Sequence, residues 1–221
     1  YTNFGNGEKN FNNVEFNDGD VSFINTSFQD GDVSFKIARF GNGKVDFHFA
    51  KFGKGNKSFE RAEFGSGGTD FRTVEFGSGR VNFNRSNFGK GDTSFEGCQF
   101  ENSKFSFKRA KFTEGSLSFE LAEMEGTEIS FERTDFAKGT ISFYNGKFDT
   151  LSLHSCHLDT YTDLRIAKCK FVDLSNTIVR DIIDLKPYEF EEEIDTIHFG
   201  GMRLIGRIYI DWERNNVKNL I

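Results

Sequence analysis

The chain has 221 residues and a formal net charge of −6, and it contains 29 phenylalanines, 23 glycines and a single proline. No stretch of 18 apolar residues occurs, which argues against a membrane-spanning helix, and the three cysteines form no paired framework. We therefore expect a cytoplasmic protein. Residues 181–195 hold seven acidic side chains and one lysine, a local charge of −6, so the remainder is near neutral, which argues against a nucleic-acid-binding protein.

Phenylalanines recur from Phe4 to Phe148 at gaps that alternate between 7 and 5 residues. The repeating unit is therefore 12 residues long and occurs 12 times, and only Met124 replaces a phenylalanine on this ladder. A fixed period of this kind is typical of a solenoid, in which the side chains of successive units stack. Each unit reads Phe-x-x-Gly-x-x-x-Phe-x-x-small-x. The glycine predicts a turn with positive φ, and the small residue predicts an inward position beside a large ring.

A small residue two positions before a phenylalanine resembles the pattern of the pentapeptide-repeat proteins. The resemblance extends from residue 4 to about residue 185. It implies a right-handed, four-sided β-helix in which the phenylalanine and the small residue point inward. This chain departs from that pattern in two respects: every second side has seven residues instead of five, and phenylalanine takes the place of the more usual leucine.

Surface charges indicate how many residues complete one coil. A 12-residue coil encloses too little volume for two phenylalanines at interior density. Stacked strands place equivalent side chains ~4.8 Å apart. A spacing of 12 would put Arg39 on Lys51, whereas a spacing of 24 puts Arg39 between Glu15 and Glu63. The sequence therefore predicts an all-β fold, a right-handed quadrilateral β-helix with about 24 residues per coil and sides of 5, 7, 5 and 7 residues.

The period shortens after Phe148, so we divide the chain into three parts. Residues 1–148 form the regular 12-residue-repeat solenoid, and residues 149–185 form pentapeptide-type coils. Residues 186–221 hold an acidic loop, a less regular final coil and the start of a short C-terminal helix, predicted from Trp212 to Ile221 with Asp211 as its N-cap. The end of the sequence resembles pentapeptide-repeat proteins in which more chain, sometimes membrane-spanning, follows. We therefore expect a soluble part of a longer protein.

Two patterns raise the question of a metal site. His154, Cys156 and His157 form a cluster, but a structural zinc site requires four ligands, and Cys156 falls on an inward position. The Gly-Asp runs near residues 18–20 and 30–32 are similar to calcium-binding β-roll turns, which need an aspartate on every rung of a nine-residue period. Zinc and calcium are the minor alternatives to a buried thiol and ordinary turns. We predict no metal and no cofactor.

No constellation of catalytic residues is recognisable in the sequence. It shows no Ser-His-Asp set with a local signature, no phosphate-binding loop that opens a helix and no histidine pair on a helix. The faces of a solenoid also lack the deep apolar pocket that enzymes favour. We therefore expect that the protein is not an enzyme.

A column of arginines is the most distinctive feature of the expected surface. In alternate units the second position after the second phenylalanine is arginine in four successive coils, and we call these residues the arginine column: Arg61, Arg85, Arg109 and Arg133. The default interpretation is a ladder of guanidinium groups paired sideways with acidic neighbours near both ends, Glu60, Glu63, Glu132 and Asp135. The alternative is a site for an anion or an acidic partner. Its candidate residues are Arg61, Arg85, Lys108, Arg109, Lys111 and Arg133.

The leading functional hypothesis is a non-enzymatic structural or protein-interaction module with an unknown protein partner. The alternative is a DNA-mimicking protein that binds a topoisomerase such as gyrase, which the resemblance to gyrase-binding members of the family implies. The acidic segment 181–195 favours this alternative, and the neutral remainder counts against it. Ice binding would need regular outward threonine arrays, which the sequence lacks. Only three residues precede Phe4, so we expect either a cap in the parent chain or an end-to-end homodimer through the N-terminal coil.

Overall fold

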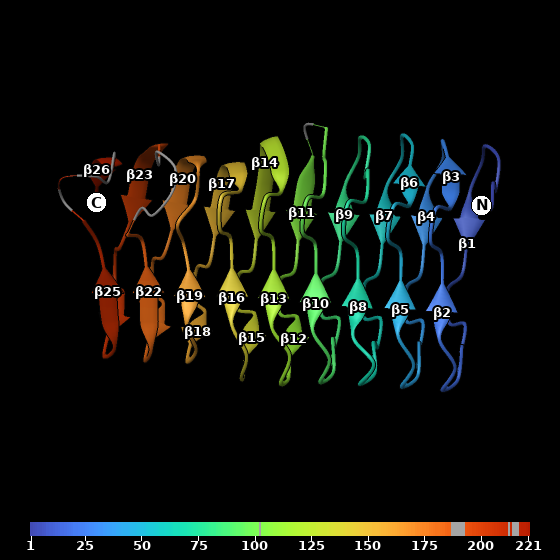
Figure 1. Cartoon of the computed structure of the whole chain (residues 1–221), viewed down its shortest axis with the longest axis horizontal. Coiled ribbons are helices and arrows are strands. Elements are labelled where there is room, and N and C mark those ends of the chain that lie inside the picture. Colours follow the sequence, from blue (N-terminus) through green and yellow to red (C-terminus); the bar gives the residue numbers. More distant parts are fainter. Residues whose placement is uncertain (102, 187–192, 212, 214–216) are drawn as a thin grey trace.

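Successive coils of the chain stack along one axis, with the N-terminal residues at one end and the C-terminal residues at the other (Figure 1). The structure is a computed structural model that describes residues 1–101, 103–186, 193–211, 213 and 217–221. The described chain is an all-β parallel solenoid of about eight turns with roughly 24 residues per turn. The predicted fold class is therefore confirmed.

Each coil has four sides, which we number in chain order from the first strand. Side 1 carries a parallel sheet of ten strands: β1 (Lys9–Asn10), β4 (Val33–Ser34), β7 (Lys57–Ser58), β9 (Val81–Asn82), β11 (Lys104–Ser106), β14 (Glu123–Ser130), β17 (Lys147–Ser152), β20 (Lys168–Asp173), β23 (Glu193–His198) and β26 (Val217–Leu220). Side 3 carries nine strands: β2 (Val21–Ser22), β5 (Val45–Asp46), β8 (Thr69–Asp70), β10 (Thr93–Ser94), β13 (Leu117–Ser118), β16 (Ile141–Ser142), β19 (Thr162–Asp163), β22 (Ile182–Asp184) and β25 (Arg207–Tyr209).

The two shorter sides carry fewer regular strands. Side 2 begins with isolated bridges that run from Glu15 to Lys111 and continues as five strands: β12 (Lys111–Phe112), β15 (Asp135–Phe136), β18 (His157–Leu158), β21 (Ile178–Val179) and β24 (Arg203–Leu204). Side 4 holds β3 (Ser27–Gln29) and β6 (Lys51–Phe52), followed by isolated bridges. From β14 onward one strand runs across both side 4 and side 1.

The stacking of the phenylalanine rings confirms the coil length. The ring of Phe52 lies parallel to Phe28 at a centroid distance of 4.5 Å and to Phe76 at 5.5 Å. Within a coil the rings meet edge to face, as Phe47 and Phe59 do at 5.7 Å and 88°. Both geometries suit the quadrupole of an aromatic ring. The interior is thus a set of phenylalanine stacks, while Phe49, off the ladder, is 47% exposed as expected for an outward position.

The regular spacing of the glycines has two physical causes, one of which the sequence does not reveal. On side 1 the predicted positive φ is found, for example 118° at Gly31. On side 3, Gly43 lies outside that region, and a Cβ built there would come within 2.3 Å of the Gly19 carbonyl oxygen in the preceding coil. Stacked backbones approach so closely at this corner that no side chain fits between them.

The left-handed corner of each coil lies elsewhere, at the second position after the second phenylalanine. These residues all have φ between 53° and 63°, whichever side chain they carry: Asn13, Asn25, Ile37, Phe49, Arg61, Thr73, Arg85, Gly97, Arg109, Leu121, Arg133 and Asn145. The polar residue that precedes each such turn accepts a backbone hydrogen bond, as Asn82 does from the N–H of Asn84 at 2.8 Å. This is the corner role predicted for the short polar residues.

The C-terminal coils are less regular than the first six. Beyond β16 the coil shortens, because Ile141 pairs with Thr162 where the earlier rungs are three residues longer. The predicted C-terminal helix is wrong: residues 217–220 form β26, which pairs with β23 through Ile194 and Val217. The open edge of β23 offers a complete ladder of backbone partners, which outweighs a short helical pattern. Asp211, the expected N-cap, instead accepts a hydrogen bond from the N–H of Glu213.

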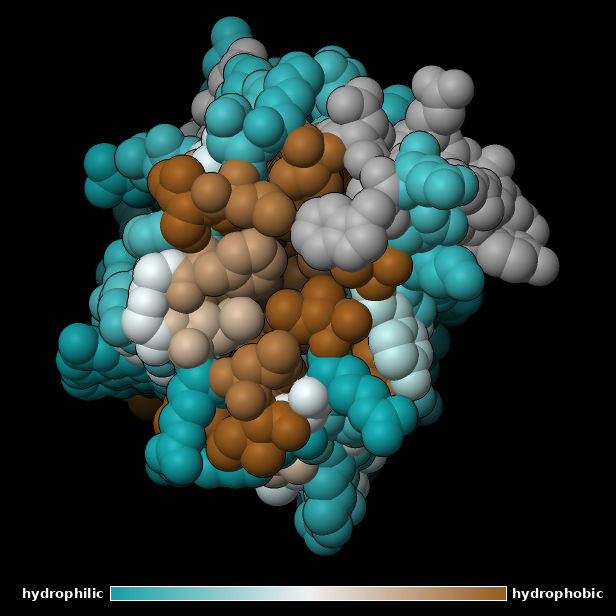
Figure 2. All heavy atoms as spheres, turned by 90° about the vertical axis from the view of Figure 1, so that its left-hand side faces the viewer, coloured by the Kyte–Doolittle hydropathy of each residue, from teal (hydrophilic) through white to brown (hydrophobic). Residues whose placement is uncertain are grey.

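Apolar side chains gather on the C-terminal end of the solenoid (Figure 2). Exposed residues there include Leu204, Ile205, Tyr209, Leu220 and Ile221. Most of the predicted acidic loop, residues 187–192, lies outside the described part of the chain. Among the described residues, no helix is long and apolar enough to cross a membrane.

Candidate partner-binding surface

The arginine column lies on the corner between side 1 and side 2. Its four members have φ of 57°, 60°, 59° and 56° and are exposed. Their backbones continue the stacking ladder, since the N–H of Arg85 donates to the carbonyl of Lys108 at 3.0 Å and that of Arg109 donates to Glu132 at 3.0 Å. The fold therefore holds four guanidinium-bearing residues in one straight row, one for each coil.

The predicted sideways pairing of the column is not found. Glu60 pairs with Lys36 at 3.9 Å, Glu63 with Arg39 at 3.5 Å and Glu132 with Lys108 at 2.7 Å. The sequence predicts that these carboxylates neutralise the ends of the column, but each is bound by a cation of its own column on side 1 or side 2. Within the described residues, no ion pair or side-chain hydrogen bond involves any of the four arginines.

The flanking lysines differ from each other. Lys108 is bound to Glu132, which lowers the pKa of that carboxyl mainly through the hydrogen bond. Lys111 stands in register with Asp135 on side 2, yet no ion pair joins them in the described chain. The cationic groups without a partner near the centre of the column are therefore Arg85, Arg109 and Lys111, and their uncharged neighbours are Asn84 and Asn87.

The fold itself does not require arginine at this corner. Asparagine and glycine adopt the left-handed conformation at the lowest steric cost, and both occur at equivalent corners, as Asn25 and Gly97 show. The corner between side 3 and side 4, which has the same backbone geometry, carries no arginine at all in the first six coils. Four arginines in succession on one corner thus need an explanation outside the packing of the solenoid.

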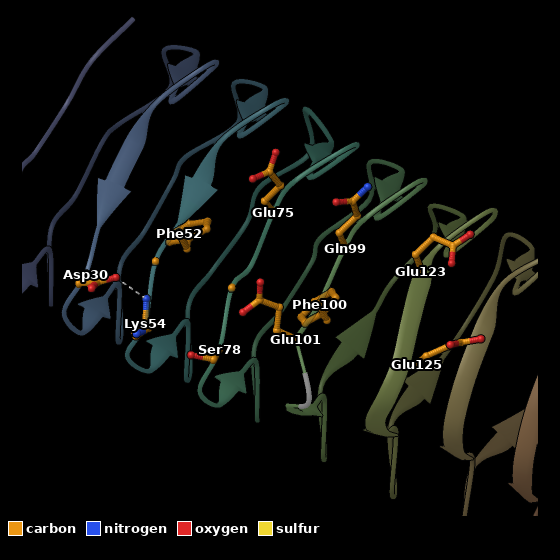
Figure 3. A pocket seen from close by; sticks show the side chains of 12 residues that line it. Asp30, Phe52, Lys54, Glu75, Ser78, Gln99, Phe100, Glu101, Glu123 and Glu125 are labelled. Carbon is orange, nitrogen blue, oxygen red and sulfur yellow. Dashed lines mark hydrogen bonds between the residues drawn. The ribbon is translucent and has the colours of Figure 1, made fainter.

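A groove of about 510 Å³ lies at the corner between side 4 and side 1 (Figure 3). Gly53 and Gly77 have no side chains to fill it, so the rings of Phe52 and Phe100 lie at its floor. Its rim is largely acidic and polar: Asp30, Lys54, Glu75, Ser78, Gln99, Glu101, Glu123 and Glu125.

Most of the acidic charge around this groove is already neutralised. Glu75 binds Lys51 at 2.6 Å, Glu123 binds Lys147 at 3.0 Å and Glu125 binds Lys168 at 3.2 Å. The carboxylate of Asp30 accepts a hydrogen bond from the backbone N–H of Lys54. These internal pairs leave little uncompensated charge to attract a cation, so the groove is a weaker candidate than the arginine column.

A buried lysine is located beneath the same corner. Lys57 occupies an inward position on side 1, where the coils on either side have Val33 and Val81. It is 1% exposed, and its Nζ donates to the carbonyls of Gly53, Gly55 and Ser78 at 2.7, 2.9 and 2.8 Å. Burial lowers the pKa of this ammonium group to about 8. Its three carbonyl partners join two coils, and its role is structural.

The structure brings together a serine, an aspartate and two histidines that no sequence motif connects. His154 Nδ1 lies 2.8 Å from the hydroxyl of Ser175, which donates to Asp173 at 2.5 Å, and His198 Nδ1 is 3.6 Å from Asp173. The residues come from three coils of unequal length, so no constant spacing links them. Ser152 and Asp173, 21 residues apart, show how the period has changed in this region.

This cluster does not have the arrangement of a catalytic triad. The hydroxyl proton of Ser175 is directed to the carboxylate of Asp173, so His154 donates to the serine oxygen and does not act as its base. Ser175 is also buried. The cluster therefore joins the coils on side 1 without activating a nucleophile.

The three cysteines are core residues. Cys98 and Cys156 donate through their thiols to the carbonyls of Phe71 and Phe131, and Cys169 is buried as well. Burial raises the pKa of Cys156 to about 12, so its thiol stays protonated. Cys156 thus lies where the buried-thiol interpretation placed it. No group of three or more metal-ligating side chains is found among the residues that the structure describes.

Comparison with known proteins adds no relative to this description. No protein-family model matches the sequence, and no curated protein matches it either. What the structure shows is a parallel β-solenoid with regularly spaced phenylalanines, of the kind found in repeat proteins.

Proposed function

We propose that the chain is a non-enzymatic protein-interaction module of the pentapeptide-repeat type, and that it binds an acidic partner along the arginine column. The observation that carries this proposal is the set of four exposed arginines on successive coils, none of which has an ion pair within the described residues. The inward small residues, such as Ala62 and Ala110, and the four-sided coil support the pentapeptide-repeat relationship.

Rigidity makes such a column suitable for binding. The phenylalanine stacks and the backbone ladder fix the corner Cα atoms, so a partner does not have to order the scaffold when it binds. Guanidinium groups recognise carboxylates through paired hydrogen bonds, and those of the column are free to do so. Because the contacts are exposed, the affinity depends strongly on ionic strength.

The test measures binding of a fluorescein-labelled poly-glutamate chain by fluorescence anisotropy at about 50 mM and about 300 mM salt. We expect binding at low salt that weakens steeply at high salt. The double variant Arg85→Glu/Arg109→Glu should abolish it. Charge is controlled by Lys54→Glu/Arg80→Glu, which changes the net charge by the same amount at exposed residues away from the column.

The thermal unfolding of both variants is measured in parallel. Binding that is lost only in the column variant, with similar melting temperatures for both, supports the proposal. Equal loss in the two variants means that the attraction is non-specific and contradicts it. A collapse of melting in the column variant alone would show instead that the arginines hold the fold together.

A further inference from the structure

The spacing of the column points to the shape of the acidic partner. We propose that the arginine column recognises an acidic α-helix that lies parallel to the solenoid axis and presents one carboxylate per turn. This inference rests on the proposed function, because it specifies the ligand of the same site.

The argument begins with the two repeats. Successive arginines stand on neighbouring parallel strands, which are ~4.8 Å apart, so the three steps from Arg61 to Arg133 span about 14 Å. An α-helix advances ~5.4 Å per turn, and three turns span about 16 Å. The mismatch is ~0.6 Å per step, which the long arginine side chains absorb by a change of rotamer.

Other acidic polymers fit this row less well. In an extended strand the side chains on one face recur about every 6.7 Å, so three steps span about 20 Å and the last carboxylate lies beyond the last arginine. The phosphates of duplex DNA follow a helical backbone that turns away from a straight row. Only a helix keeps one anionic group opposite each of the four coils, at the positions i, i+4, i+7 and i+11.

The charge along the column also suits a ligand with its acidic groups at the centre. The terminal arginines have acidic neighbours, Glu60 beside Arg61 and Asp135 close to Arg133, although neither is paired with them. Around the two central arginines the side chains are uncharged or basic, with Lys111 on the side 2 flank. A helix is ~10–12 Å across with its side chains. It can therefore contact the corner and one flanking residue at the same time.

The experiment uses Ala-rich peptides of about 19 residues, long enough to form a helix in water. The first peptide carries glutamates at i, i+4, i+7 and i+11. The second has the same composition with glutamates distributed around the helix, and the third has the first sequence with a central proline that breaks the helix. A duplex DNA of equal charge is the fourth probe. Binding of each to the complete 221-residue chain is followed by anisotropy, and helicity by circular dichroism.

We expect the one-face peptide to bind at least about tenfold more tightly than the second and third peptides and the DNA. Arg85→Asn/Arg109→Asn should weaken its binding by about tenfold, since each exposed pair contributes a few-fold. Asparagine suits the left-handed corner, so this variant should stay folded. The matched control, Lys54→Asn/Arg80→Asn, should change binding less than about twofold.

The outcomes separate the two proposals. If all acidic peptides bind equally and depend on Arg85 and Arg109, the helix inference is wrong while the proposed function stands. Preferred binding of the duplex DNA likewise overturns it. If no peptide shows a dependence on the two arginines, both proposals fail.

Discussion

The ring of Phe83 lies parallel to that of Phe59, with the centroids 4.5 Å apart and the planes within 2°. The same ring stacks on Phe107 at 5.0 Å in the next coil and meets Phe71 and Phe95 edge to face. A ring in the middle of the chain thus contacts the coils on both sides as well as its own. The free energy of the interior is shared among residues that are far apart in the sequence.

Replacement of this ring tests the inward register. Phe83→Ala should lower the free energy of unfolding by about 3–5 kcal/mol, because it removes a fully buried ring and leaves a cavity. Phe49→Ala, at an exposed position, should lower it by less than about 1 kcal/mol. Urea unfolding measures both. Similar losses at the two positions would contradict the packing described above.

The left-handed corner predicts that a member of the arginine column can be replaced with a gain in stability. Arg85→Asn should raise the free energy of unfolding by up to about 1 kcal/mol, since asparagine tolerates the φ of 60° better than arginine does. Arg80→Asn, an exposed arginine without a positive φ, should stay within about 0.5 kcal/mol of the parent. A clear loss of stability in Arg85→Asn would show that the guanidinium group contributes to folding.

Two glycines of one column form a matched pair. A Cβ at Gly43 would lie 2.3 Å from the carbonyl oxygen of Gly19, whereas a Cβ at Gly19 would meet no atom within 4 Å. Gly43→Ala should therefore cost about 1–3 kcal/mol or more, because backbone atoms must move. Gly19→Ala should be neutral or slightly stabilising, because it restricts the unfolded chain. Equal effects in thermal unfolding would argue against close approach as the cause.

Lys57 predicts a pH dependence with a definite sign. Burial lowers its folded-state pKa to about 8 from the ordinary value of 10.5, so between these pH values the unfolded chain binds more protons than the folded chain. Stability therefore rises with pH through this interval, by up to about 3 kcal/mol, and the cost of burying the charge is fully present below about pH 8. The measurement is the difference in unfolding free energy between the parent and Lys57→Met from about pH 7 to about pH 10.5. A difference that does not change with pH would contradict a buried ammonium group.

End-to-end pairing through the N-terminal coil stays a prediction. Phe4 is 40% exposed although its ring stacks on Phe28 at 5.2 Å. We expect sedimentation of the 221-residue chain to show a dimer that Phe4→Asp/Phe11→Asp weakens, because the variant places charge on the apolar coil face. A monomer at high concentration would contradict pairing for this chain.

The sequence predicts the coil but not its corners. Phenylalanine and small residues at a constant spacing specify stacking, so their spacing alone is enough to place Phe28, Phe52 and Phe76 in one stack. The left-handed corners are not predictable in this way, because isoleucine, phenylalanine and arginine show no preference for that conformation. Stacking imposes it on whichever residue falls there.

The candidate site is predictable only in part. The spacing places the arginine column in one row but suggests its acidic neighbours as partners, since spacing alone does not reveal that Lys36, Arg39 and Lys108 bind them. The cluster around Ser175 escapes prediction because the coil length changes after β16. The final strand escapes it as well, because a local helical pattern carries no information about β23, the distant strand with which it pairs.

The 24-residue coil has a consequence for how such a chain can grow. The sequence unit has 12 residues, but a full turn requires two units, so an inserted single unit rotates everything after it by half a turn. With such an insertion after Arg85, Arg109 and Arg133 would move to the corner between side 3 and side 4, away from Arg61 and Arg85. Insertion of two units would lengthen the solenoid and keep every surface row aligned. Duplication by pairs is thus the only whole-unit route that preserves a continuous row of arginines.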